Sequence, residues 1–156
     1  MAFKRYRGKT KIMYFKGDTA REVRDGSLVT LSDSATVVPV RNDSTDRAIG
    51  VARANDTTTD SSMVPVEVPV ESAVEWEIDV DSDGGAADSD IGRYCAVDTA
   101  GGGSVVAGDS CGMRVDVSDT GVPQIFITGR VSATKVIGTI SKTAWVRSFD
   151  TLDTTG

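Results

Sequence analysis

The chain has 156 residues, a formal net charge of -6 and no histidine. Its length suits one domain that buries roughly 70% of the surface of its unfolded chain. The lack of histidine removes the commonest general base, the nucleophile pairs that depend on it and most zinc sites. Carboxylates are plentiful, but they fall in predicted loops or on a predicted wet face, where burial would not raise their pKa. We therefore expect a protein that is not an enzyme.

The first 16 residues combine basic and aromatic side chains, and we expect them to form an extended N-terminal arm. Residues 1–24 carry eight Lys or Arg against two acidic residues, a net of +6, so the remainder carries -6 - 6 = -12. Such an arm can add a strand to a partner's sheet edge or stack on single-stranded nucleic acid, and an ordinary first strand fits the pattern too. We favour a protein partner over nucleic acid. The predicted contact residues are Phe3, Lys4, Arg5, Tyr6, Arg7, Lys9, Lys11, Ile12 and Tyr14.

Residues 17–150 are predicted to form one β domain, followed by a polar tail over residues 151–156. Sixteen glycines, many turn signals and the lack of a long helical period favour about ten short strands. We expect an all-β fold, an antiparallel barrel or sandwich. The predicted strands outside the central stretch are 27–31, 35–41, 47–54, 91–98, 111–118, 124–131, 135–141 and 143–149.

The central stretch, Met63–Asp81, alternates apolar and polar residues almost without error. A period of two predicts strands with one dry face and one wet face. A single strand of this length would be unusual, so we expect a break near residues 72–73. The dry face comprises Val64, Val66, Val68, Val70, Val74, Trp76, Ile78 and Val80, and the wet face comprises Pro65, Glu67, Pro69, Glu71, Glu75, Glu77 and Asp79.

Two prolines constrain the first half of this stretch. Pro65 and Pro69 have the same parity, so their missing amide hydrogens face the same neighbouring strand. Since a central strand cannot repeatedly lose ladder bonds on one side, we expect Val64–Val70 to be an edge strand or to join its partner only briefly.

An acidic loop follows the second half of the stretch. Asp79, Asp81 and Asp83 precede Gly84, and Asp90 stands twelfth, as in a calcium-binding loop. The flanking residues have strand character and the last ligand is not Glu, so a solvated acidic turn fits as well. We expect no obligatory cofactor and keep calcium as an alternative.

The cysteines and the apolar runs argue against a disulfide framework, a secretory signal and a membrane span. Cys95 and Cys111 are too few for a disulfide framework, although they could meet across a hairpin. No segment has the apolar core of a secretory signal or the length of a membrane span. We therefore expect no membrane partner.

Several segments resemble a known family. The runs Gly26–Leu31, Ala48–Ala52, Val64–Val70, Asp90–Asp98 and Ala133–Gly138 are similar to those of the small head-decoration, or capsid-cement, proteins of tailed bacteriophages. The resemblance covers most of the chain and consists of short β segments, without a catalytic signature.

The resemblance implies a specific role. Such proteins are compact, commonly trimeric β proteins that sit on the outer capsid of the virion and clamp neighbouring major capsid subunits. It implies that this chain forms a homotrimer and that its arm reaches the major capsid protein.

Two other functions stay open. A sugar- or surface-binding module of a tail or adhesin would need exposed aromatic residues, yet Trp76 has dry parity and only Trp145 is left among the tryptophans. A neck or tail-tube subunit would assemble into rings in place of trimers.

Overall fold

The computed structural model describes residues 3–19, 21–41, 47–56, 63–71, 74–81, 84–99, 113–119 and 124–141. In these ranges the chain forms β-strands and one short 3-10 helix, η1, so the predicted all-β class is confirmed. The elements are β1 (Phe3–Arg7), β2 (Thr10–Lys16), β3 (Leu28–Leu31), β4 (Val37–Pro39), β5 (Gly50–Ala52), β6 (Met63–Pro69), β7 (Glu75–Asp79), η1 (Asp88–Asp90), β8 (Tyr94–Thr99), β9 (Met113–Asp116), β10 (Ile125–Ser132) and β11 (Lys135–Ile140).

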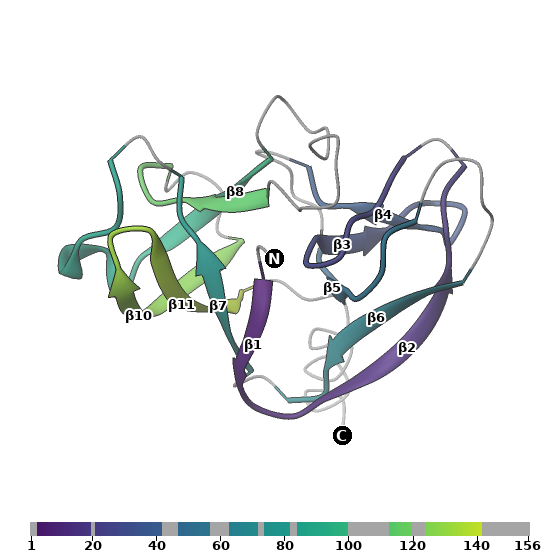
Figure 1. Cartoon of the computed structure of the whole chain (residues 1–156), viewed down its shortest axis with the longest axis horizontal. Coiled ribbons are helices and arrows are strands. Elements are labelled where there is room, and N and C mark those ends of the chain that lie inside the picture. Colours follow the sequence, from purple (N-terminus) through teal and green to yellow (C-terminus); the bar gives the residue numbers. More distant parts are fainter. Residues whose placement is uncertain are drawn as a thin grey trace, which may run out of the picture.

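The strands form two antiparallel sheets, and the fold is a sandwich with no closed barrel. One sheet has six strands in the order β1-β7-β11-β10-β8-β9, and the other has five in the order β2-β6-β5-β3-β4. Figure 1 shows the two sheets side by side, with the chain passing from β1 in one sheet to β2 in the other. Both sheets therefore have an N-terminal strand at one edge.

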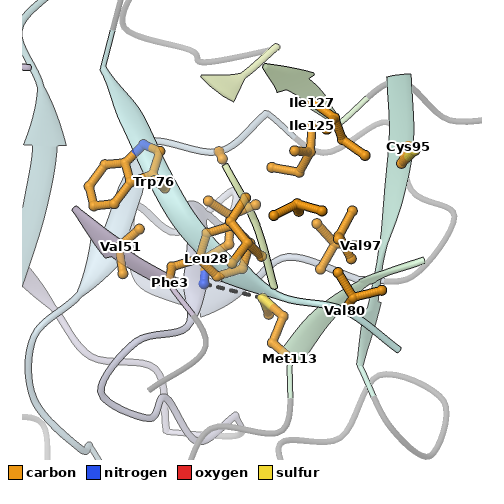
Figure 2. Packing of buried hydrophobic residues seen from close by; sticks show 14 of the residues in the cluster. Phe3, Leu28, Val51, Trp76, Val80, Cys95, Val97, Met113, Ile125 and Ile127 are labelled. Carbon is orange, nitrogen blue, oxygen red and sulfur yellow. Dashed lines mark hydrogen bonds between the residues drawn. The ribbon is translucent and has the colours of Figure 1, made fainter. Parts of the chain in front are cut away.

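Two hydrophobic clusters stabilise the sandwich. The larger one joins the sheets, because Leu28 and Val51 of the five-stranded sheet pack with Phe3, Trp76 and residues of the six-stranded sheet (Figure 2). The smaller cluster lies on the other face of the five-stranded sheet and includes Val29, Val64, Val66 and Val68. Adjacent residues of a strand point to opposite faces, so Leu28 and Val29 serve different clusters. Each fully buried Val, Leu or Ile contributes roughly 1.5–3 kcal/mol.

The alternation in Met63–Asp81 is confirmed, with a correction at each face. Val64, Val66 and Val68 are buried in one cluster, whereas Trp76, Ile78 and Val80 are buried in the other. The stretch thus supplies strands to both sheets, and the expected break at 72–73 lies outside the described residues. On the dry face, Val70 is 42% exposed. On the face predicted to be wet, Glu67, Pro69 and Glu75 are buried.

The edge position predicted for the proline-containing strand is wrong, although brief pairing on one side is found. β6 lies between β2 and β5, and it pairs with β2 along its whole length but with β5 at only two positions. The backbone N–H of Val70 donates to Lys9, while the carbonyl of Pro65 accepts from Arg53. Pro65 and Pro69 therefore direct their missing donors toward β5, where little ladder is lost.

The N-terminal segment differs from the expected arm. Residues 3–7 and 10–16 are strands, and β1 pairs with β7 while β2 pairs with β6. Phe3 is fully buried in the larger cluster, whereas the other four residues of β1 are exposed. In the described chain the β domain thus begins at β1, before the predicted boundary at residue 17. The predicted strand at 143–149 and the tail at 151–156 lie outside the described residues.

Candidate docking surface

Strand β2 is an edge strand of the five-stranded sheet in the described chain, and directly after it Gly17 forms an isolated bridge with Val37 of β4. Strand β2 is the first strand in the sheet order, so within the described chain only β6 pairs with it along its length. The carbonyl of Lys9 faces β6, so alternate residues from Thr10 to Lys16 direct their backbone N–H and C=O groups to the opposite side. Such a row of backbone groups can accept a further strand.

Exposed apolar side chains accompany this edge. Tyr14 is 63% exposed, Ile12 48% and Met63 56%, and Pro65 is half-buried beside them. In the register of β2 and β6, Tyr14 lies opposite Pro65, which makes the four residues neighbours on one face. We call Ile12, Tyr14, Met63 and Pro65 the docking patch.

Most of the predicted contact residues are exposed, with one correction. Phe3 is buried and therefore cannot be a surface anchor. The exposed members divide between the two edge strands and the turn joining them: Lys4, Arg5, Tyr6 and Arg7 on β1, Lys9 in the turn, and Lys11, Ile12 and Tyr14 on β2. Only Ile12 and Tyr14 belong to the docking patch, and Lys11 and Lys16 are exposed on the same strand.

A half-buried ion-pair network holds β1 and β2 in place. Arg53 contacts the carboxylate of Glu67 at 2.6 Å, and Arg5 approaches the same carboxylate at 3.4 Å. Thr10 donates a 2.8 Å hydrogen bond to Glu67, while Arg53 also donates to the carbonyl of Phe3 at 3.0 Å. The Arg53 guanidinium lies 5.7 Å from the centre of the Trp76 ring. Glu67 is therefore the shared acceptor at the junction of the two sheets.

Arg7 is likewise engaged within the chain. Its guanidinium contacts the buried carboxylate of Glu75 at 2.6 Å, and its Nε donates to the same oxygen at 2.8 Å. Arg5 and Arg7, both predicted partner contacts, thus stabilise the packing of the N-terminal strands. A partner-binding role stays a prediction for the lysines of β1, β2 and their turn.

The predicted calcium ligands that the structure describes have other partners. Asp79 lies 3.3 Å from Lys135, Asp81 lies 3.8 Å from Arg114, and Asp90 accepts from the backbone of Ala87 at 2.8 Å. Hydrogen bonds to Glu77 and Asp79 raise the pKa of Lys135. Among the described residues no group of three His, Cys, Asp or Glu could hold a metal, but Asp83 lies outside them. Calcium binding stays untested.

Cys95 is a buried thiol in the larger cluster. Burial raises its pKa to about 11, and the nearby carboxylate of Asp90 adds to the shift. Its thiolate is therefore scarce at neutral pH. Cys111 lies outside the described residues, so the pairing of the two cysteines stays open.

An aromatic pair lies on the six-stranded sheet, where sequence reasoning missed it. The rings of Tyr94 and Phe126 have centroids 4.8 Å apart, and Tyr94 is 48% exposed. Trp76 is fully buried, as its parity predicts, and Trp145 lies outside the described residues. The sequence did contain an indication of an aromatic surface here, because Phe126 stands between the core residues Ile125 and Ile127 and so faces the other side of the sheet.

The docking patch also contains residues that the sequence did not single out. Met63 and Pro65 lie on the face of β6 that the alternation predicts to be polar. An apolar Met63 on that face was therefore an indication of a contact surface. Its proximity to Tyr14 depends on a strand pairing between segments about 50 residues apart. In the described part of the chain, no helix is long and apolar enough to cross a membrane.

Comparisons with protein-family models, with curated proteins and with solved structures found no match for this chain.

Proposed function

We propose that this protein is a head-decoration protein that binds the outer capsid surface of a tailed phage and clamps neighbouring major capsid subunits. The observation that carries the proposal is the edge position of β2, with its exposed docking patch beside Lys16 and with Lys11 exposed on the other face of the strand. A structural clamp needs adhesive edges on a stable body, and this edge combines backbone groups, apolar anchors and positive charge.

The partner segment that fits this edge is an extended, acidic strand of the major capsid protein. Backbone hydrogen bonds would supply affinity, and the docking patch would receive apolar side chains from alternate positions of that strand. The lysines would favour carboxylates, although each exposed ion pair contributes only about 0.2–1 kcal/mol. Apolar contact and strand pairing therefore carry the attachment, whereas charge guides the choice of partner.

We further propose that the protein binds as a homotrimer. Three β2 edges on one particle make the second and third contacts intramolecular, which raises the overall affinity by orders of magnitude without any new contact. Analytical ultracentrifugation tests this directly, because a trimer supports decoration whereas a larger ring favours a neck or tail-tube subunit.

Cosedimentation with capsids of the source virus tests the function. The variant Ile12→Ser/Tyr14→Ser removes two apolar anchors, and we expect it to bind at least about tenfold more weakly, since an anchor contributes about 1 kcal/mol or more. The matched control is Ile91→Ser/Val131→Ser, which removes apolar residues of similar exposure (45% and 52%) elsewhere.

Wild-type and control proteins are expected to saturate the capsids equally. If the wild-type protein does not bind at all, the decoration function is wrong; if the patch variant binds as tightly as the wild type, the attachment surface is wrong. A truncation that starts at Gly17 is unsuitable, because it removes β1, β2 and the buried Phe3 together.

A further inference from the structure

A pocket lies on the six-stranded sheet, where Gly8 and Glu71 from the connections to the five-stranded sheet also line it. It is an open cavity of about 470 Å³, a size that suits a small ligand. Phe126, Thr128 and Thr139 come from β10 and β11, while Arg7, Glu71 and Glu75 contribute polar groups from β1 and the β6–β7 region. We call these six residues, together with Gly8, the sheet pocket.

Two irregular strand pairings border the pocket. The register of β1 and β7 shifts between Arg5 and Arg7, which sets Arg7 opposite Glu75. The register of β10 and β11 shifts between Ile127 and Gly129, so Thr128 is the additional residue there. Bulges redirect side chains and are frequent beside binding sites. Both shifts change the course of a strand where it contributes to the pocket.

The backbone directly after β1, beside the pocket, requires a glycine. Gly8 has a φ of +103°, and a Cβ there would lie 2.7 Å from the Cα of Val74. A larger residue would force the β1–β2 turn away from the segment that carries Glu71 and Glu75. The polar wall of the pocket is therefore held close to the sheet by backbone packing.

The chemistry of the pocket fits an uncharged ring with many hydroxyls. Phe126 is half-buried and its ring packs against Tyr94, which gives a stable aromatic surface for the C–H groups of a sugar. Arg7 and Glu75 offer adjacent donors and acceptors for neighbouring hydroxyls, and Thr139 lies opposite Phe126 in the register. The two carboxylates and one guanidinium sum to -1, which disfavours an anionic ligand.

We propose that the sheet pocket binds a neutral hexopyranose, such as a residue of a cell-surface glycan. The inference does not rest on the decoration function, because the pocket and the docking patch share no residue. On a capsid surface, however, such a site would give the particle weak contacts with glycans that many copies reinforce.

The test is an amide-resolved NMR titration of the whole protein with the methyl glycosides of glucose, galactose, mannose and N-acetylglucosamine. We expect at least one of them to bind saturably, with a dissociation constant on the order of 1 mM, because so small a ligand has few binding atoms. Shifts should concentrate at Phe126, Thr128, Thr139 and Arg7. If none of the four causes saturable shifts there, the proposal is overturned.

Variants and a charged probe sharpen the test. Phe126→Ala should abolish binding and Thr139→Val should weaken it several-fold, whereas the docking-patch variant Tyr14→Ser should leave it unchanged. Glucuronate should bind more weakly than methyl glucoside. Unchanged binding by a folded Phe126→Ala protein, or tighter binding of glucuronate, would contradict the assignment. Capsid cosedimentation of Phe126→Ala should stay at the wild-type level, which separates this site from the docking patch.

Discussion

Glu67 is a buried carboxylate at the junction of the two sheets. Its side chain is only 10% exposed and lies within 3.4 Å of two guanidinium groups, from Arg53 and Arg5. Removing one partner of a buried pair leaves an uncompensated charge, which costs far more than breaking a pair in water. The same carboxylate on an exposed face would contribute little.

Replacing Glu67 with Gln should therefore lower the free energy of unfolding by about 3 kcal/mol. The control is Glu77→Gln, which breaks a more exposed pair with Lys135, a residue that keeps its contact with Asp79, and should cost about 0.5 kcal/mol. Urea denaturation measures both. Equal losses in the two variants would show that the Glu67 network contributes no more than a surface ion pair.

Cys95 should be resistant to thiol reagents in the folded protein. Its pKa of about 11 leaves roughly one thiol in a thousand ionised at pH 8, against about a quarter for an unfolded cysteine with a pKa near 8.5. In a Cys111→Ser variant, labelling at pH 8 should be at least about 100-fold slower than in urea. Labelling at equal rates would contradict this burial.

The same pKa sets a direction for stability. The folded state holds the proton of the Cys95 thiol more tightly than the unfolded state does. The contribution of this thiol to the free energy of unfolding is therefore fully present below about pH 8.5, and it is lost as the pH rises through about 11.

The period of two predicted which residues face the core, but not which polar residues are covered. Trp76, Ile78 and Val64 are buried as their parity indicates. Glu67 and Glu75 share the polar parity yet are buried, because Arg53, Arg5 and Arg7 approach them from distant segments. The alternation of a strand predicts which side chains share a face. Which distant residues cover that face depends on how the strands pair in the fold.

At the scale of elements, β6 shows how local rules and sheet order combine. The prolines predicted an edge strand or a brief pairing. The brief pairing is found with β5, but β6 is not an edge strand, because β2 pairs with it on the other side. The basic residues of the first 16 positions suggested an arm, and this composition concealed the burial of Phe3 in β1 and the alternation that half-buries Met13 and Phe15 in β2. The strands from β3 to β11 lie within a few residues of their predicted ranges, since turn residues separate them.

The short contact between β5 and β6 predicts a specific sensitivity at Gly50. A Cβ on Gly50 would collide with the backbone carbonyl of Glu67, so β5 could not stay at its present distance from β6. We expect Gly50→Ala to lower the free energy of unfolding by about 2 kcal/mol or more. Gly84→Ala is the matched control, because a Cβ there meets nothing within 4 Å and should change stability by less than about 0.5 kcal/mol. Chemical denaturation that finds equal effects would contradict the β5–β6 packing.

For the whole molecule, the distribution of charge and the edge position of β2 support the proposed attachment through this strand. The segment that contains β1 and β2 belongs to the basic first 24 residues, at +6, whereas the rest of the chain carries -12. Both strands are sheet edges, and the docking patch lies along β2. An acidic partner strand would meet attraction at this edge and repulsion over much of the remaining surface.

Hydrogen–deuterium exchange of the protein, free and bound to capsids of the source virus, tests this attachment most directly. If a capsid strand pairs with β2, the amides of Ile12 and Tyr14, which face away from β6, should exchange markedly more slowly in the bound state, while those of β10 and β11 stay unchanged. Saturable binding without added protection in β2 would show that another surface holds the capsid and would contradict the central claim.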